Sequence, residues 1–257
     1  MELKFKTVEW RENKLIVLDQ SRLPHKEIYL KLKHYEEVAH IIETLKIRGA
    51  PLIGVVAAYG VVLGAKDFRG KSEDDFLDDM ENVVKRVKNT RPTAYNLFWA
   101  LNQMEVILQE KASIEELTQK LLEKANEIAE FERNVTYKIG EYGATLVPDN
   151  ANIVTHCNAG ALATNGLGTA LAPVYTAHSQ GKKLHVFAGE TRPALQGARL
   201  TVWELCKNNI PVTLLCDSAR GILFMRKKID LCIVCLLYTS DAADEGLGVD
   251  LGGRRII

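Results

Sequence analysis

Four short apolar segments in the second half of the chain alternate with segments of helical pattern. The apolar segments are "ANIVTHC" (151–157), "KKLHVFAG" (182–189), "IPVTLLCD" (210–217) and "IDLCIV" (229–234). Strands that alternate with helices in this way form a parallel sheet with right-handed crossovers. The pattern therefore predicts a Rossmann-like α/β domain, in which ligands bind beyond the carboxyl ends of the strands.

The residues before this region follow a different pattern. Short alternating runs at 3–10, 14–20 and 27–33 indicate small antiparallel strands. Helical periodicity takes over from Tyr35. The turn "PDN" at 148–150 marks a boundary between the two parts. We expect an α-rich domain with a small β entry over 1–147 and an incomplete Rossmann-like domain over 148–234.

Several helices are predicted in the first part. The segment 35–47 places four apolar side chains on one face, namely Val38, Ile41, Ile42 and Leu45. The segment 52–65 is almost uniformly apolar, which indicates a buried helix. Ser72 precedes an acidic first turn, a favourable start for the helix over 72–90.

Composition excludes several classes of protein. The chain has 33 basic and 33 acidic residues among 257, so no nucleic-acid footprint spreads over the whole molecule. The five cysteines show no metal-ligand spacing with histidine, which indicates reduced thiols and no metal site. The first residues, "MELKFKTVEW", have no apolar signal core, and no apolar run reaches the length of a membrane span. We expect a cytoplasmic protein.

The stretch "THCNAGALATNGLGTAL" lies where the first strand of the parallel sheet ends. Cys157 follows this strand, and a thiol there would feel the positive end of the next helix. The glycines that follow allow close backbone approach to a ligand, although the spacing is not that of a dinucleotide fingerprint. The alternative is a buried structural cysteine, and His156 fits a packed, hydrogen-bonded histidine better than a base.

The stretch "GETRPALQGARL" has the equivalent place after the second strand. Its arginines and Gln196 suit the recognition of a phosphate or carboxylate. The alternative is an internal ion pair of Glu190 with Arg192 or Arg199.

Two arginines precede helices of the first domain. Arg48 stands before Gly49, Ala50 and Pro51, and Arg91 stands directly before a proline. The helix dipole slightly disfavours a cation at a helix start, so these arginines indicate an anion site built from guanidinium groups and helix N-termini.

Taken together, "IRGAPLIGVVAAYG", "RPTAYNLFWAL", "THCNAGALAT…GLGTAL" and "ETRPALQGARLTVWEL" resemble the methylthioribose-1-phosphate isomerases of methionine salvage. The order and spacing agree as far as about Val234. The wider superfamily includes ribose-1,5-bisphosphate isomerases and regulatory subunits of a translation-initiation exchange factor. The resemblance implies a homodimeric enzyme that needs no cofactor and converts 5-methylthioribose 1-phosphate to 5-methylthioribulose 1-phosphate.

The resemblance also implies roles for individual residues. The family's catalytic cysteine corresponds to Cys157. Its substrate contacts correspond to Arg48, Gly49 and Ala50 of "RGA", to Arg91 of "RPT" and to Gln196 of "LQGARL". After the last strand the family continues with a "GADRI" segment that carries a catalytic Asp, and then with "NKIGT". Neither segment is present in this sequence, so we expect these 257 residues to be inactive or nearly so.

Residues 235–257 do not follow the family at all. "CLLYTSDAAD" and "VDLGGRRII" are the translations of parts of a transposase-based sequencing adapter. We hypothesise that 235–257 is adapter-derived sequence fused to a truncated gene, and the codons of the underlying DNA test this.

Two other functions remain open at this point. One is isomerisation of a related sugar phosphate, such as ribose 1,5-bisphosphate or 5-deoxyribose 1-phosphate. The other is a non-catalytic regulatory subunit that senses sugar phosphates or nucleotides, although a sensor would not need the thiol of Cys157.

Overall fold

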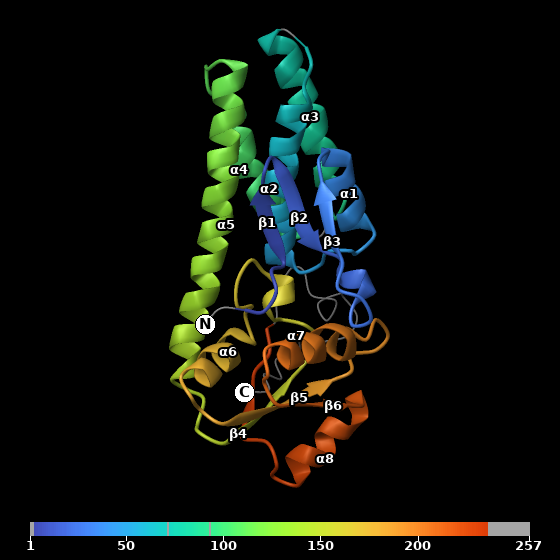
Figure 1. Cartoon of the computed structure of the whole chain (residues 1–257), viewed down its shortest axis with the longest axis vertical. Helices are drawn as coiled ribbons and strands as arrows, with labels where there is room; N and C mark the ends of the chain where they lie inside the picture. The colour runs from blue at the N-terminus through green and yellow to red at the C-terminus, as the bar shows by residue number, and fades with distance from the viewer. Residues whose placement is uncertain (1–2, 71, 93, 236–257) are drawn as a thin grey trace, which may run out of the picture.

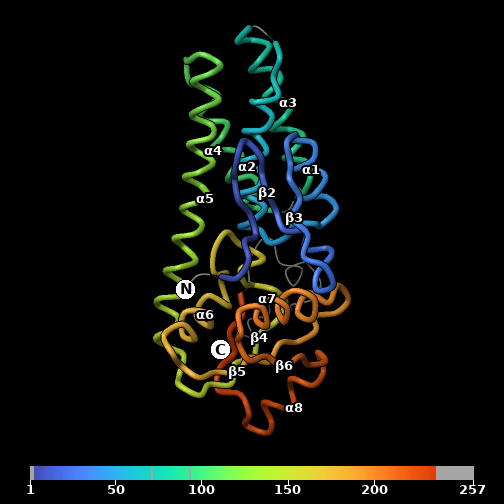
Figure 2. The backbone as a smooth tube through the Cα atoms, in the orientation of Figure 1, coloured from blue at the N-terminus to red at the C-terminus, as the bar shows by residue number. Residues whose placement is uncertain are grey.

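A computed structural model describes residues 3–70, 72–92 and 94–235. The molecule is elongated, with a helical layer at one end and a parallel sheet at the other (Figure 1). The smooth trace in Figure 2 shows that the chain passes from the first layer to the second at the end of one long helix, α5. The hypothesis about 235–257 concerns residues that, apart from Cys235, lie outside this description.

A small antiparallel sheet opens the chain and covers the helical layer. Its strands, in the order β1-β2-β3, are Val8–Arg11, Lys14–Leu18 and Tyr29–Leu32. Leu15 and Val17 on the central strand are completely buried, because alternate residues of a strand point to the same face. The three alternating runs in the sequence therefore correspond to three paired strands.

Helix α2, Ala50–Asp67, is the centre of the helical layer. The helices around it are α1 (Tyr35–Glu43), α3 (Glu73–Lys88), α4 (Tyr95–Leu108) and α5 (Ile114–Ala144). Among the described helices α2 has the length and hydropathy of a membrane span, but 83% of that stretch is buried within the protein. Its apolar character is therefore that of a core helix packed on all sides.

Serine side chains begin two of these helices. The hydroxyl of Ser72 accepts a hydrogen bond from the backbone N–H of Asp75, so the predicted start of α3 is confirmed. Ser113 forms a full capping box with Glu116 at the start of α5. Each cap satisfies N–H groups that the first helical turn leaves without a partner.

The prediction that Leu45 belongs to the apolar face of the first helix is wrong. Helix α1 ends at Glu43, and Leu45 has a positive φ of 54° and is 53% exposed. The N–H groups of Lys46 and Ile47 both turn back to the carbonyl oxygen of Ile41, which ends the helix. Ile47, completely buried, fills the core position that the periodicity assigned to Leu45.

The second layer contains a parallel four-stranded sheet in the order β6-β5-β4-β7. The strands are β4 (Ala151–Thr155), β5 (Leu184–Gly189), β6 (Val212–Leu215) and β7 (Leu231–Cys232). The connecting helices are α6 (Ala172–Ser179), α7 (Val202–Lys207) and α8 (Arg220–Met225). The predicted α/β fold class with a parallel, Rossmann-like sheet is confirmed.

Two hydrophobic cores correspond to the two layers. The second core includes Ile153 and Val186 from the sheet, and also Phe5, Leu18 and Leu23 from the start of the chain. The amino-terminal residues therefore pack against the parallel-sheet layer as well as their own. The division into 1–147 and 148–234 stays a prediction.

Candidate active site

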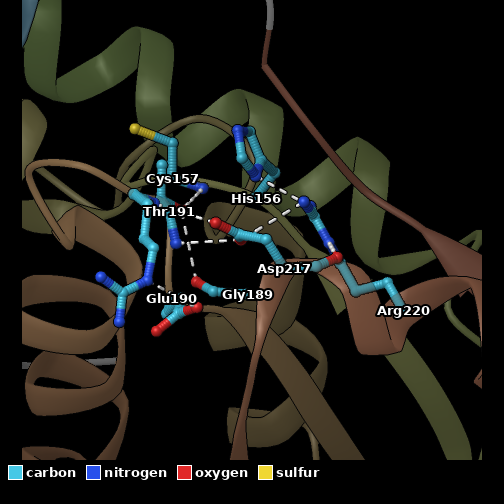
Figure 3. Close-up of polar contacts among 8 residues, drawn as sticks. His156, Cys157, Gly189, Glu190, Thr191, Asp217 and Arg220 are labelled. Atoms are coloured by element: carbon cyan, nitrogen blue, oxygen red, sulfur yellow. Dashed lines mark hydrogen bonds and ion pairs between the residues drawn. The ribbon is translucent and has the colours of Figure 1, made fainter.

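The carboxyl ends of three neighbouring strands meet at one edge of the parallel sheet. Cys157 follows β4, Thr191 follows β5 and Asp217 follows β6. Parallel strands all end at the same edge, so the chain order brings these three residues together. Figure 3 shows Asp217 between the turn that carries Thr191 and the side chain of Arg220.

The backbone of Cys157 is fixed on both sides. Its φ of 58° lies in the left-handed region, which non-glycine residues rarely adopt. Its N–H donates to Oγ1 of Thr191 at 3.0 Å, and its carbonyl oxygen accepts from Oγ1 of Thr201 at 2.5 Å. The thiol is partly buried, and its Sγ lies 3.2 Å from Oε1 of Gln196.

A π-helical turn, Gly197–Thr201, brings Gln196 and Thr201 to the same thiol-bearing residue. An α-helix rotates about 100° per residue, so residues five apart would diverge by about 140°. Here the N–H of Val202 donates to the carbonyl oxygen of Gly197, which is the i to i+5 pattern of a π turn. The wider turn lets two residues five positions apart face Cys157 together.

Asp217 stabilises the turn that holds Cys157. Its two carboxylate oxygens accept the N–H groups of Thr191 at 3.0 Å and of Arg192 at 2.9 Å. Burial opposes ionisation of Asp217, but these N–H donors and the Arg220 guanidinium outweigh it and lower the pKa of the carboxyl group. The carboxylate is therefore charged at neutral pH and fixes the start of the β5–α7 connection.

His156 is held by the same cluster. Nη1 of Arg220 lies 2.8 Å from Nδ1 of His156. Because a guanidinium group only donates, Nδ1 must be the acceptor, and the proton of the neutral ring lies on Nε2. This geometry agrees with the interpretation of His156 as a packed, hydrogen-bonded histidine.

Arg48 connects the helical layer to the loop after β4. Its Nη1 lies 2.6 Å from Oδ1 of Asn158, and its Nη2 lies 2.9 Å from the carbonyl oxygen of the same residue. Arg48 precedes Gly49, which caps α2 with a φ of 95°, and Pro51 lies in the first turn. The guanidinium group is thus fixed beside both the start of α2 and the residue that follows Cys157.

The charged residues after β5 have structural partners. Arg192 forms an ion pair with Glu190 at 3.2 Å, as the alternative interpretation predicted. Arg199 does not pair with Glu190, since its guanidinium group donates to carbonyl oxygens of Ser21 and Leu23. It ties the second layer to the amino-terminal segment.

A cavity of about 270 Å³ opens between the start of α2 and the loop after β4. It is lined by all six residues that the resemblance assigns to the site, which are Arg48, Gly49, Ala50, Arg91, Cys157 and Gln196. Val234 and Cys235, which follow β7, also line it. The structure therefore brings together in one place residues that are up to 148 positions apart in the sequence.

Among the described residues, the side chains that could bind a metal ion do not form a cluster. Within the described ranges, no group of three or more His, Cys, Asp or Glu side chains lies close enough to hold a metal ion. Besides the guanidinium, amide and thiol groups already named, the polar side chains that line the cavity include His156, Thr164 and Thr169.

Sequence reasoning missed several residues of this region. Asn158, Thr191 and Thr201 contact Arg48 or the backbone of Cys157, and Asp217 contacts the turn at Thr191; none of the four was named from the sequence. Asp217 is the last residue of the predicted strand segment 210–217, so its position at a carboxyl end was a usable signal. Asn158 and Thr201 gave no comparable signal, because their partners lie far away in the sequence.

Comparison with known proteins shows which family this chain resembles over most of its length. The sequence model of the initiation factor 2 subunit family matches residues 46–235. The methylthioribose-1-phosphate isomerase of Geobacter sulfurreducens is 46% identical over 234 residues, which cover 90% of this chain and 68% of that protein. The isomerase of the same name from Carboxydothermus hydrogenoformans is 49% identical over 230 residues, covering 89% and 66% respectively.

Two solved structures share the fold, and each is 38% identical to this chain in sequence. The 5-methylthioribose 1-phosphate isomerase of Pyrococcus horikoshii superposes with a TM-score of 0.84 at 38% identity, covering 89% of this chain and 65% of that one. A structure from A. fulgidus described as the delta subunit of translation initiation factor eIF-2B gives 0.82 at 38% identity, covering 91% and 68%.

Proposed function

This chain belongs to the initiation factor 2 subunit family and, within it, to the methylthioribose-1-phosphate isomerases, and we propose that its cavity is built for their reaction. The reaction is the isomerisation of 5-methylthioribose 1-phosphate to 5-methylthioribulose 1-phosphate. The observation that carries the proposal is the single cavity lined by Arg48, Arg91 and Cys157.

The phosphate group of the substrate fits the arginine side of the cavity. Guanidinium groups bind phosphate oxygens through paired hydrogen bonds, and the first turn of α2 offers backbone N–H groups at the positive end of the helix dipole. We assign Arg48, Gly49, Ala50 and Arg91 to this phosphate. The phosphate ester at C1 prevents spontaneous ring opening, so holding it is a prerequisite for the chemistry.

The loop after β4, which also lines the cavity, supplies the reacting group. Ring opening breaks the bond between C1 and the ring oxygen and adds a proton to that oxygen. Isomerisation moves a hydrogen from C2 to C1, and the hydroxyl group on C2 loses its proton to become the ketone. A thiol can both give and take a proton, and we assign this role to Cys157, with Gln196 orienting its Sγ across 3.2 Å.

The second catalytic group is not among the residues of this sequence that match the family. Strand β7 pairs directly with β4, the strand that precedes Cys157. An aspartate after β7 would therefore belong beside the thiol, which is where the family's "GADR" segment follows. We propose that these 257 residues bind the substrate and turn it over slowly or not at all.

Calorimetric titration of the chain with 5-methylthioribose 1-phosphate tests the binding. We expect saturable binding at one site, and a loss of at least about tenfold in affinity for Arg91→Ala. Titrations with ribose 1,5-bisphosphate, 5-deoxyribose 1-phosphate and a nucleoside monophosphate run in parallel. Tighter binding of any of these would replace the proposed substrate with that ligand class, and no binding of 5-methylthioribose 1-phosphate would overturn the proposal.

Turnover is followed separately by ³¹P NMR of the same mixtures. Appearance of the ketose phosphate would confirm the isomerase activity, and rapid appearance would contradict the proposal that these 257 residues are inactive or nearly so. An unchanged spectrum with saturable binding supports both parts of the proposal.

We further propose that the protein is cytoplasmic and forms a homodimer. Cys206, Cys216 and Cys232 are exposed thiols that form no disulfide, as expected in a reducing compartment, and the family resemblance implies the dimer. Light scattering after size-exclusion chromatography measures the mass in solution, and a monomeric mass would contradict the second statement.

A further inference from the structure

A buried carboxylate lies beneath the active-site loop. Glu204 of α7 is completely buried, although the residues around it in the sequence are largely apolar. Its carboxylate accepts hydrogen bonds from the side-chain amide of Asn158, the N–H of Ala161 at 2.7 Å and the hydroxyl of Tyr175 at 3.1 Å. Amide N–H groups can only donate, so the site is arranged for an acceptor at the position of Glu204.

This carboxylate fixes the orientation of one amide. Nδ2 of Asn158 donates to Glu204 and, at 3.1 Å, to Oγ1 of Thr201. Because both amide protons point toward Glu204 and Thr201, Oδ1 of Asn158 must point away from them. It accepts from Nη1 of Arg48 at 2.6 Å. The orientation of the guanidinium group thus depends on a carboxylate that does not touch it.

The same carboxylate reaches Cys157 by a second route. The hydroxyl of Thr201 accepts from Nδ2 of Asn158 and donates its proton to the carbonyl oxygen of Cys157 at 2.5 Å. A hydroxyl that already accepts one hydrogen bond is oriented to donate the other way. Arg48 and Cys157, which both line the cavity, are therefore connected through a single buried group.

Stability alone gives little reason for a charge at this position. Removing a carboxylate from water costs several kcal/mol, and a well-packed apolar side chain would often serve the core as well. Burial raises the pKa of Glu204 to about 7, while the hydrogen bonds from Asn158, Tyr175 and the N–H groups of Ala161 and Leu162 favour the charged form. What an apolar residue could not supply is the orientation of Asn158 and of the loop backbone at Ala161.

We propose that Glu204 is a positioning residue, which sets Arg48 and Cys157 in one common frame through the side chains of Asn158 and Thr201. This proposal about Glu204 rests on the proposed function in one respect only, namely that the ligand of Arg48 is a phosphate group. Glu204 does not touch the cavity and takes no part in proton transfer.

Glu204→Gln tests the proposal, because it keeps the volume and removes one acceptor oxygen. The first measurement is the rate at which iodoacetamide alkylates Cys157, resolved from the other cysteines by peptide mass spectrometry. We expect alkylation of Cys157 to become at least about threefold faster as its backbone loosens, with the exposed Cys206 and Cys232 unchanged. The second is the affinity for inorganic phosphate by ³¹P line width, which should fall at least about fivefold.

Tyr175→Phe is the matched control. It removes a hydrogen bond to the same carboxylate, but on the side away from Asn158. We expect a lower thermal midpoint with both readouts within about twofold of the parent chain. If Tyr175→Phe and Glu204→Gln change both readouts equally, the role of Glu204 is merely structural and the proposal is overturned.

A second variant keeps the test decisive if Glu204→Gln does not fold. Thr201→Val removes only the hydroxyl that contacts Cys157, and it should accelerate alkylation of Cys157 at least about threefold. An unchanged rate would contradict the proposed route. Alkylation requires no substrate, so a failure to bind 5-methylthioribose 1-phosphate would overturn the proposed function without affecting this result.

Discussion

The guanidinium group of Arg48 makes two hydrogen bonds to Asn158, one to the side-chain oxygen at 2.6 Å and one to the carbonyl oxygen at 2.9 Å. The two residues are 110 positions apart and belong to different layers of the molecule. This pair therefore serves the fold, by joining α2 to the loop after β4, and also the cavity, by fixing a cation in its wall.

Replacing Arg48 by lysine should weaken both roles. An ammonium group is a compact charge that cannot reproduce the planar, two-point contact with Asn158. We expect a loss of about 1–2 kcal/mol in the free energy of unfolding and at least about tenfold in affinity for 5-methylthioribose 1-phosphate. Chemical denaturation and calorimetry measure the two effects.

Arg69→Lys provides the comparison for that variant. Arg69 is an exposed residue whose Nη1 contacts nearby backbone carbonyl oxygens. Its replacement should leave both quantities unchanged within error, and an equal loss in the two variants would contradict the role given to Arg48.

The sequence indicated those site residues that stand at the end of an element. Cys157 follows an apolar strand and Arg48 precedes an apolar helix, and strand ends and helix starts can be recognised from local patterns. Gln196 was also indicated, by its place after a strand, but its contact with Cys157 depends on a π turn that no local pattern predicts.

The remaining residues of the region could not be found in this way. Glu204 and Asn158 become important because they meet each other across 46 positions, and neither residue type is unusual where it stands. Leu45 illustrates the opposite error, since helical periodicity continued past the residue at which the backbone turned. Local patterns describe periodicity and caps, whereas these features follow from long-range packing.

Gly49→Ala should disrupt the contact between the two layers. A Cβ atom at this position would lie 2.4 Å from the carbonyl oxygen of Ala163, and the φ of 95° is itself unfavourable for alanine. Backbone atoms must move to relieve such a contact, so we expect a loss of roughly 3 kcal/mol or more in the free energy of unfolding.

The variant Gly181→Ala separates the effect of the positive φ from the effect of the close contact with Ala163. Gly181 has a similar φ of 88°, but a Cβ atom there would meet nothing within 4 Å. Its replacement should cost roughly 1 kcal/mol, the penalty of the left-handed conformation alone. Equal losses at the two positions, measured by urea denaturation, would show that close approach to Ala163 is unimportant.

Asp217→Asn should destabilise the turn after β5 in a pH-dependent way. The folded-state pKa of this carboxyl group lies below its unfolded value, so its stabilisation is present above the unfolded pKa and is lost as the pH falls through the folded one. We expect a deficit of about 1–2 kcal/mol at pH 7 that shrinks below about pH 4. A deficit that stays constant from pH 7 to pH 3 would contradict this assignment.

Glu132 should respond to pH with the opposite sign. This residue of α5 lines an apolar cleft with Trp99 and Phe131, and burial raises the pKa of its carboxyl group to about 7. The folded state then holds the proton more tightly than the unfolded state between about pH 4.5 and pH 7, so stability falls as the pH rises through that window. Glu204 contributes in the same direction.

The variant Glu132→Gln should remove the part of this pH-dependent loss of stability that is due to Glu132. An amide resembles the protonated acid and does not ionise, so the variant should lose about 2–3 kcal/mol less than the parent chain between pH 4.5 and pH 7.5. Urea denaturation at intervals across this range measures the slope, and Glu130→Gln, at an exposed position of the same helix, should leave the slope unchanged. Because Glu204 still titrates in the variant, the free energy of unfolding should still fall with rising pH, but less steeply than in the parent chain. A slope equal to that of the parent chain would mean that the carboxyl group of Glu132 is hydrated in the folded protein.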